Sequence, residues 1–253
     1  MPRMRAATSS RWFRPSLLVT AAALVAALAV TQAAAPPDPV REAERWVART
    51  LQSMTLDQKV GQLLVPAFDS TYLSTDSDRF DALVELVKEQ HVGGFVAFGG
   101  SVPTPSVLLN PTYSTVVLGQ PLEAAATANR LQQAAALPLL VAADFEWGVG
   151  MRIAGATSFP RAMAFGAAGD EALAREAGRI IGVEARAIGV HVNFAPVADV
   201  NNNARNPVIN TRSFGEDPQR VAALAVAYAR GLRDGGALAT VKHFPGHGDT
   251  DVD

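Results

Sequence analysis

Short apolar runs alternate with amphipathic helical segments along most of this 253-residue chain. The apolar runs have the length and flanking residues of buried strands, and they cover residues 65–68, 91–98, 139–143, 190–195 and 237–241. Helical spacing of apolar side chains predicts helices over residues 39–54, from 55 onward, and over 80–90, 121–136, 171–187 and 216–234. Such alternation requires parallel strands joined by right-handed crossovers.

Polar side chains follow the ends of the last three predicted strands. Asp144 comes directly after the third, Asp199 follows the fourth, and Lys242 and His243 follow the fifth. Because a (β/α)8 TIM-type barrel builds its site at the carboxyl ends of its strands, the pattern predicts that fold. About five of the eight β/α units are present, so we expect an N-terminal fragment of the barrel. A doubly wound open sheet is the alternative, but no glycine-rich phosphate fingerprint follows the first strand.

The first 35 residues differ from the rest. Four arginines precede an apolar stretch over residues 17–30, and small residues follow it. This order is typical of a secretory signal peptide, with an uncleaved membrane anchor as the alternative. We therefore expect residues 1–35 to be a signal, 36–54 a linker and N-terminal helix, and 55–253 the barrel domain. The mature protein is expected to be periplasmic or extracellular, with no stable membrane insertion after cleavage.

Composition narrows the possible partners. The chain is 49% hydrophobic and 18% charged, which is an ordinary globular composition, and it has no cysteine. A formal net charge of -2 without any long basic run argues against binding nucleic acid. Small neutral or mildly acidic molecules fit better as ligands.

The last twelve residues, KHFPGHGDTDVD, form the predicted chemical centre. His243 and His247 are four apart, but Pro245 between them makes a metal-binding helix implausible. The three closing aspartates imitate the start of a calcium loop without its glycine or closing glutamate. We therefore expect no metal and no cofactor.

Two further groups of residues are candidates for the site. Asp144 and Glu146 have the composition of a glycosidase carboxylate pair, although two acids in a solvated loop are also common. Arg152, Arg205 and Arg212 follow predicted strands, where their guanidinium groups can orient hydroxyls and carbonyls.

Three motifs resemble the N-terminal barrel domain of glycoside hydrolase family 3, and more narrowly its β-N-acetylglucosaminidase branch. They are FAPVADV at residues 194–200, RSFGEDP at 212–218 and KHFPGHG at 242–248, and the resemblance extends from about Leu56 to Asp253.

The resemblance implies roles for individual residues. Asp144 becomes a sugar-binding residue and Glu146 its neighbour, which replaces the carboxylate-pair hypothesis. The same matching assigns sugar contacts to Arg152, Arg212, Lys242 and His243. Asp253 matches the aspartate that supports an acid/base histidine two residues further on, and the nucleophile is an aspartate on a later strand. Neither of these two residues is among the 253.

The implied activity is that of a retaining exo-β-N-acetylglucosaminidase acting on cell-wall or chitin-derived saccharides through a glycosyl-enzyme. Because histidine titrates near neutral pH, such a dyad can give and retake a proton. One departure concerns specificity, since Trp147 stands where relatives commonly have glycine. A family 3 hydrolase of β-glucosidase type, a non-catalytic carbohydrate-binding barrel and a metal-dependent hydrolase are the alternatives. The fragment itself is expected to be inactive.

Overall fold

The computed structural model describes residues 38–69, 73–74, 76–98 and 120–252. The expected signal peptide and Asp253 lie outside these residues. The chain divides into two compact units, Met1–Ser53 and Met54–Asp253. No helix in the described ranges is long and apolar enough to cross a membrane.

Helix α2, Pro39–Ser53, is the described part of the first unit. Its apolar residues recur at helical spacing, as the sequence predicted, but none of its side chains is buried. Trp46 and Leu51 remain 47% and 50% exposed.

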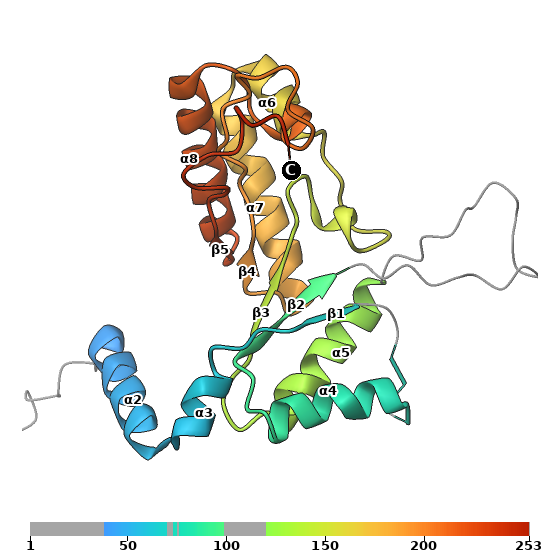
Figure 1. The fold of residues 1–253 in the computed structure, drawn as a ribbon, viewed down its shortest axis with the longest axis vertical. Coiled ribbons are helices and arrows are strands. Elements are labelled where there is room, and N and C mark those ends of the chain that lie inside the picture. Colours follow the sequence, from blue (N-terminus) through green and yellow to red (C-terminus); the bar gives the residue numbers. More distant parts are fainter. Residues whose placement is uncertain (1–37, 70–72, 75, 99–119, 253) are drawn as a thin grey trace, which may run out of the picture. The chain divides into compact units, whose positions relative to one another are not determined.

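A parallel sheet organises the second unit (Figure 1). Its five strands lie in chain order and each pairs in parallel with the next: β1 Ala67–Asp69, β2 Gly94–Phe98, β3 Leu140–Ala143, β4 Val192–Asn193 and β5 Leu238–Ala239. A doubly wound sheet reverses its strand order at a switch point, whereas a barrel does not. The unbroken order therefore agrees with part of a barrel.

Helices connect consecutive strands, with caps that the sequence encodes. They are α4 Asp78–Lys88, α5 Pro121–Ala134, α6 Ala162–Ala168, α7 Glu171–Ala187 and α8 Pro218–Asp234, with short 3-10 turns η2 Val149–Met151 and η3 Asn210–Arg212, while α3 Leu56–Gly61 precedes β1. Thr55 and Gln58 form a capping box at the start of α3, where the sequence predicts a helix to begin. Asp170 accepts hydrogen bonds from the first turn of α7.

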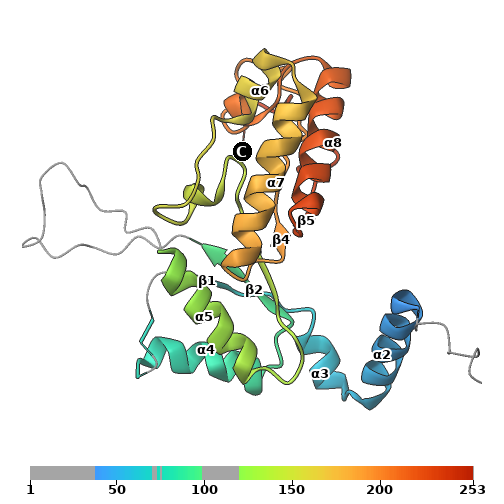
Figure 2. The same ribbon diagram turned by 180° about the vertical axis from the view of Figure 1, so that it is seen from behind.

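The core lies between the strands and these helices. Phe95 on β2, Ile181 on α7 and Leu232 on α8 are fully buried. Helices α7 and α8 approach each other at glycines: a Cβ on Gly231 would lie 2.0 Å from the carbonyl oxygen of Arg175. Figure 1 and its reverse view, Figure 2, show α7 on one face of the strands.

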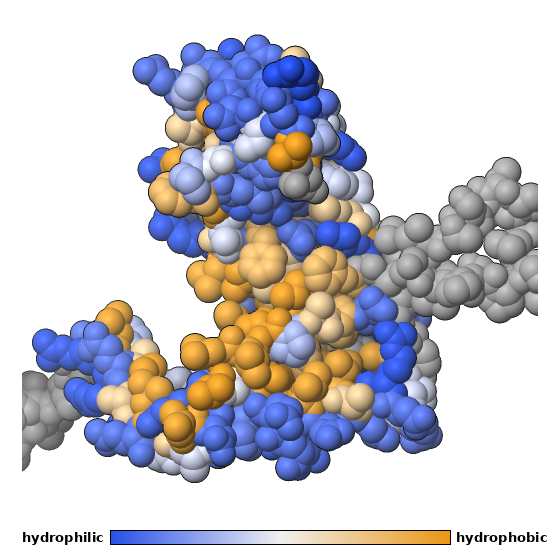
Figure 3. Space-filling model, in the orientation of Figure 1, coloured by the Kyte–Doolittle hydropathy of each residue, from blue (hydrophilic) through white to orange (hydrophobic). Residues whose placement is uncertain are grey.

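The other face of the strands carries exposed apolar side chains. Figure 3, in the orientation of Figure 1, shows apolar surface over the strands. Leu140 on β3 and Leu238 on β5 are 47% and 60% exposed. In a (β/α)8 barrel this face is the filled interior.

The structure corrects the predicted strand lengths. The runs 190–195 and 237–241 contain only two-residue strands, β4 and β5. The chain leaves the ladder before Pro196, which has no N–H to donate, and rejoins it briefly where Val197 pairs with Lys242. Helix α6 is an additional element between β3 and β4 that the alternation did not predict.

Candidate active site

The site begins where β3 ends, at Asp144, Phe145 and Glu146. Asn193 on β4 binds both backbone groups of Phe145: its Oδ1 accepts from the N–H at 2.9 Å and its Nδ2 donates to the carbonyl at 3.2 Å. The Phe145 side chain points into the core, 1% exposed. This contact fixes the backbone from which both carboxylates project.

Tyr228 on α8 also stabilises this turn. Its hydroxyl lies 3.1 Å from the carbonyl oxygens of both Phe145 and Glu146. Burial, together with the nearby Glu146 charge, raises the pKa of Tyr228 far above its usual value. The hydroxyl therefore keeps its proton and acts as a donor. Asn193 and Tyr228 were absent from the predicted site, although an asparagine within the apolar run 190–195 was a usable signal.

Lys242, just beyond β5, joins the two carboxylates. Its Nζ lies 2.7 Å from Asp144 Oδ1 and 2.7 Å from Glu146 Oε1. Glu146 also receives a bidentate pair from Arg212, with Nη2 to Oε1 at 2.7 Å and Nε to Oε2 at 2.9 Å. Arg152 Nη2 lies 3.6 Å from Asp144 Oδ2. The loops after three different strands therefore meet in one polar cluster.

The two carboxylates of this cluster differ in accessibility. The side chain of Glu146 is 7% exposed and that of Asp144 is 19% exposed. Burial raises the pKa of Glu146, but the hydrogen bonds from Arg212 and Lys242 outweigh it, so the net pKa lies below the usual value. The Glu146 hydrogen bond correspondingly raises the pKa of Arg212. Both groups are therefore held in their charged forms.

Arg152 is placed by an aromatic contact as well as by charge. Its guanidinium carbon lies 5.2 Å from the centre of the Phe98 ring at the end of β2. This distance is within the range of a cation–π contact. Arg152 contacts Oδ2 of Asp144, whereas Lys242 contacts Oδ1.

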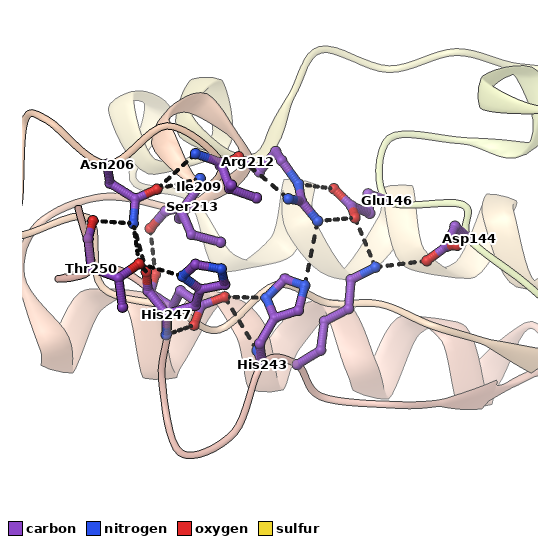
Figure 4. A network of polar contacts seen from close by, with 12 residues as sticks. Asp144, Glu146, Asn206, Ile209, Arg212, Ser213, His243, His247 and Thr250 are labelled. Atoms are coloured by element: carbon purple, nitrogen blue, oxygen red, sulfur yellow. Dashed lines mark hydrogen bonds and ion pairs between the residues drawn. The ribbon is translucent and has the colours of Figure 1, made fainter. Parts of the chain in front are cut away.

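His243, next to Lys242 in the chain, contacts both Asp199 and Arg212. Its Nδ1 is 2.6 Å from Asp199 Oδ2, and its Nε2 is 3.4 Å from Arg212 Nη2 (Figure 4). Asp199 is 2% exposed and also accepts from the backbone N–H of His247 at 2.6 Å. One buried carboxylate thus holds two positions of the loop after β5.

The loop after β4 holds the rest of that terminal loop. Asn206 Nδ2 donates to the carbonyl oxygens of His247 at 2.6 Å and Thr250 at 3.1 Å. Asn203 Nδ2 lies 2.8 Å from Asp251 Oδ1. Arg205, a candidate because it follows a predicted strand, pairs with Asp251 at 3.2 Å in an exposed position. It does not join the cluster around Lys242.

The structure therefore brings five of the six predicted site residues together: Asp144, Arg152, Arg212, Lys242 and His243. Their roles as sugar ligands stay predictions, and Asp253 lies outside the described residues. Across the described ranges no three histidine, aspartate or glutamate side chains are grouped so that they could hold a metal ion.

Comparison with known proteins identifies the family. Residues 55–253 match the glycosyl hydrolase family 3 N terminal domain. The chain belongs to glycosyl hydrolase family 3. The expected resemblance and the barrel fold are thereby confirmed.

Relatives of this family 3 chain carry related activities in their names. It is 36% identical over 203 residues to a "Beta-N-acetylglucosaminidase/beta-glucosidase" of Cellulomonas fimi, covering 80% of this chain and 31% of the relative. It is 40% identical over 177 residues to "Beta-hexosaminidase A" of Pseudoalteromonas piscicida, covering 68% of this chain and 28% of the relative.

A solved family 3 β-N-acetylglucosaminidase from Paenibacillus sp. str. FPU-7 superposes with a TM-score of 0.66 and 43% identity, covering 79% of this chain and 35% of that one. The chain thus spans about a third of the length of these relatives.

Proposed function

We propose that the protein containing this chain is a retaining exo-β-N-acetylglucosaminidase that removes terminal N-acetylglucosamine from cell-wall or chitin-derived saccharides. The observation that carries the proposal is the cluster in which Lys242, Arg212 and Arg152 surround Asp144 and Glu146 at the strand ends. The names of the relatives support the activity class.

The charges of the site suit an uncharged ligand. Three carboxylates, Asp144, Glu146 and Asp199, are matched by three cations, Arg152, Arg212 and Lys242. A site without net charge has no electrostatic preference for an ionic substrate. Its fixed donors and acceptors can instead pair with hydroxyl and amide groups of a sugar.

The two carboxylates after β3 are suited to different tasks. Asp144 uses Oδ1 for Lys242, while Oδ2 has only a 3.6 Å contact with Arg152, and its side chain is 19% exposed. Asp144 can therefore accept a sugar hydroxyl directly. Glu146 is nearly enclosed by its two cations. It positions Arg212 and Lys242, which face the ligand.

The proposed chemistry has two steps. An aspartate on a later strand forms a covalent glycosyl-enzyme, and a histidine paired with Asp253 protonates the leaving group and then activates water. Both partners lie outside the 253 residues, so we further propose that the polypeptide 1–253 alone does not turn over substrate.

The experiment uses the full-length enzyme with aryl β-N-acetylglucosaminides and aryl β-glucosides, with proton NMR to identify the first anomer released. The proposal expects hydrolysis of the N-acetyl substrate with the β-anomer released first. Inverted product, or no turnover of either substrate, would overturn it.

A β-glucosidase specificity is the second candidate, since one relative's name includes both activities. Trp147 is the departure from the family pattern that bears on specificity. Arg161 lies 4.8 Å above the indole ring, so this face is covered and cannot stack on a sugar. Faster hydrolysis of the glucoside in the same assay would favour this alternative.

We also propose that the protein is exported and that residues 1–35 are removed. N-terminal sequencing of the protein from its native host tests this, and a retained Met1 or Pro2 would contradict it.

A further inference from the structure

Asp199 is a buried carboxylate to which neither the predicted site nor the proposed chemistry assigns a task. It follows β4, is 2% exposed, and its side chain has no exposed surface. Its oxygens accept from three N–H groups, all in the loop after β5: the His243 backbone at 3.2 Å, the His243 ring at 2.6 Å and the His247 backbone at 2.6 Å. A carboxylate this deep requires such partners.

These contacts determine where the proton of the His243 ring lies. An ionised carboxylate only accepts hydrogen bonds, so Nδ1 at 2.6 Å from Asp199 must carry the hydrogen. A guanidinium only donates, so Nε2 at 3.4 Å from Arg212 presents its lone pair. The two neighbours require the same tautomer from opposite sides of the ring.

The same carboxylate also fixes the course of the loop. Oδ2 holds His243 while Oδ1 holds the N–H of His247, four residues further on. The two imidazole rings stand nearly perpendicular, with their centroids 6.0 Å apart. Asp199 therefore sets the start of the segment that leads to Asp253.

We propose that Asp199 is a positioning residue for the sugar site. Its hydrogen bond from Nδ1 fixes the tautomer of His243 so that Nε2 presents its lone pair to Arg212, one of the predicted sugar ligands. Its second oxygen fixes the loop at His247. The proposal rests on the proposed function only for the identity of the ligand, since the tautomer is a property of the free protein.

Asp199→Asn is the direct test, because an amide keeps the shape but offers only one accepting oxygen. Either the amide nitrogen faces the N–H of His247, or it faces Nδ1 of His243. In the second case the ring must accept at Nδ1 and carry its hydrogen on Nε2, opposite the donating Arg212. Each arrangement removes one of the two hydrogen bonds, either the one that fixes the tautomer of His243 or the one that fixes the loop at His247.

Ser213→Ala is the matched control. The Ser213 hydroxyl donates to the backbone carbonyl of Asp199 at 2.5 Å and is fully buried, yet it touches neither histidine. The substitution Ser213→Ala removes a buried hydrogen bond to the backbone of Asp199 and leaves the Asp199 carboxylate intact. Comparable losses of stability with different effects on His243 therefore separate positioning from folding.

The measurements are long-range 1H–15N spectra of histidine-labelled full-length protein and titration with N-acetylglucosamine. We expect the wild-type and Ser213→Ala proteins to show the Nδ1–H tautomer of His243. Asp199→Asn is expected either to shift it to Nε2–H or to keep it while losing the hydrogen bond to the N–H of His247, and in both cases to weaken sugar binding about 10- to 100-fold, as when the partner that orients a ligating histidine is removed. Ser213→Ala should bind the sugar like the wild type.

Three results would overturn the proposal. The first is an Nε2–H tautomer of His243 in the wild-type protein. This result needs no variant, so the proposal can be refuted even when Asp199→Asn does not fold. Unchanged tautomer and affinity in Asp199→Asn would do the same. So would equal loss of affinity in both variants, which indicates a structural role. If the wild type binds no N-acetylglucosamine but His243 responds as expected, the positioning role stands and the proposed function fails.

Discussion

Replacing Glu146 by glutamine tests the central ion-pair cluster. Glutamine preserves the volume of the side chain but removes the charge, and its amide nitrogen must face a cationic donor. Arg212 then loses its bidentate partner, while Lys242 keeps Asp144 at 2.7 Å. The perturbation therefore leaves an uncompensated cation in a mostly enclosed position.

The cost follows from the burial of the pair. Removing one partner of a buried ion pair costs about 3–5 kcal/mol, because the other charge remains desolvated. Here the side chains of Arg212 and Lys242 retain 20% and 16% exposure, and Lys242 keeps one carboxylate, so the loss is smaller. We expect the free energy of unfolding to fall by about 2–3 kcal/mol at neutral pH.

This loss has a defined pH dependence. Burial raises the pKa of Glu146, but the hydrogen bonds from Arg212 and Lys242 lower it further, so the folded pKa lies below the unfolded value. A carboxyl with a depressed pKa contributes stability that is full above the unfolded pKa and is lost as pH falls through the folded one. The difference between wild type and Glu146→Gln should therefore be constant near pH 7 and shrink below about pH 4.

Urea unfolding at several pH values measures the effect, with the fluorescence of the adjacent Trp147 as one signal and circular dichroism as another. A loss of 2–3 kcal/mol corresponds to a midpoint shift of about 1 M. Glu176→Gln is the control, since Glu176 makes the same bidentate pair with Arg179, at 2.6 and 2.8 Å, on an exposed helix surface. Equal shifts for both variants, or a Glu146 effect that persists at low pH, would refute the reasoning.

Three further predictions use simple assays. In the full-length enzyme, Asp144→Ala should raise KM and weaken binding of an unreactive sugar analogue, whereas Asp253→Ala should lower kcat by about 10²- to 10⁴-fold. Gly248→Ala should lower the free energy of unfolding by about 1–3 kcal/mol in urea, because its Cβ would lie 1.7 Å from the carbonyl oxygen of Val200. Asp170→Ala should cost about 1 kcal/mol in the same assay, by removing the N-cap of α7.

Local sequence signals were sufficient to predict most of the fold. The capping box at Thr55 and the N-cap at Asp170 begin helices at the predicted residues because their side chains bind nearby N–H groups. Strand ends were less predictable, since apolar residues continue past the hydrogen-bonded ladder. The predicted strand 190–195 continues through Phe194 to Ala195, which is fully buried, yet β4 ends at Asn193. Burial and strand pairing are separate properties, and periodicity reports only the first.

The partners within the site could not be predicted in the same way. Strand order alone placed Asp144 and Lys242 at one edge of the sheet. Lys242 bridges Asp144 and Glu146 because of the directions in which these two carboxylate side chains point. Asn193 fixes those directions through the backbone of Phe145. The contact joins residues 48 positions apart, so the asparagine in the run 190–195 indicates a buried polar partner but not which residue that partner is.

The structure also bears on the carboxylate-pair hypothesis that the residues alone suggested. A general acid in a glycosidase needs a raised pKa, but the pKa of Glu146 is lowered by its two cations in spite of burial. A nucleophile needs an oxygen free to attack, but Oε1 of Glu146 contacts both Arg212 and Lys242 and Oε2 contacts Arg212. Glu146 is thus poorly suited to either role, whereas Asp144 keeps an accessible oxygen. Two acids two residues apart therefore differ in their suitability: Glu146 supports the cations, Asp144 is the one we propose as the sugar ligand, and exposure, not spacing, distinguishes them.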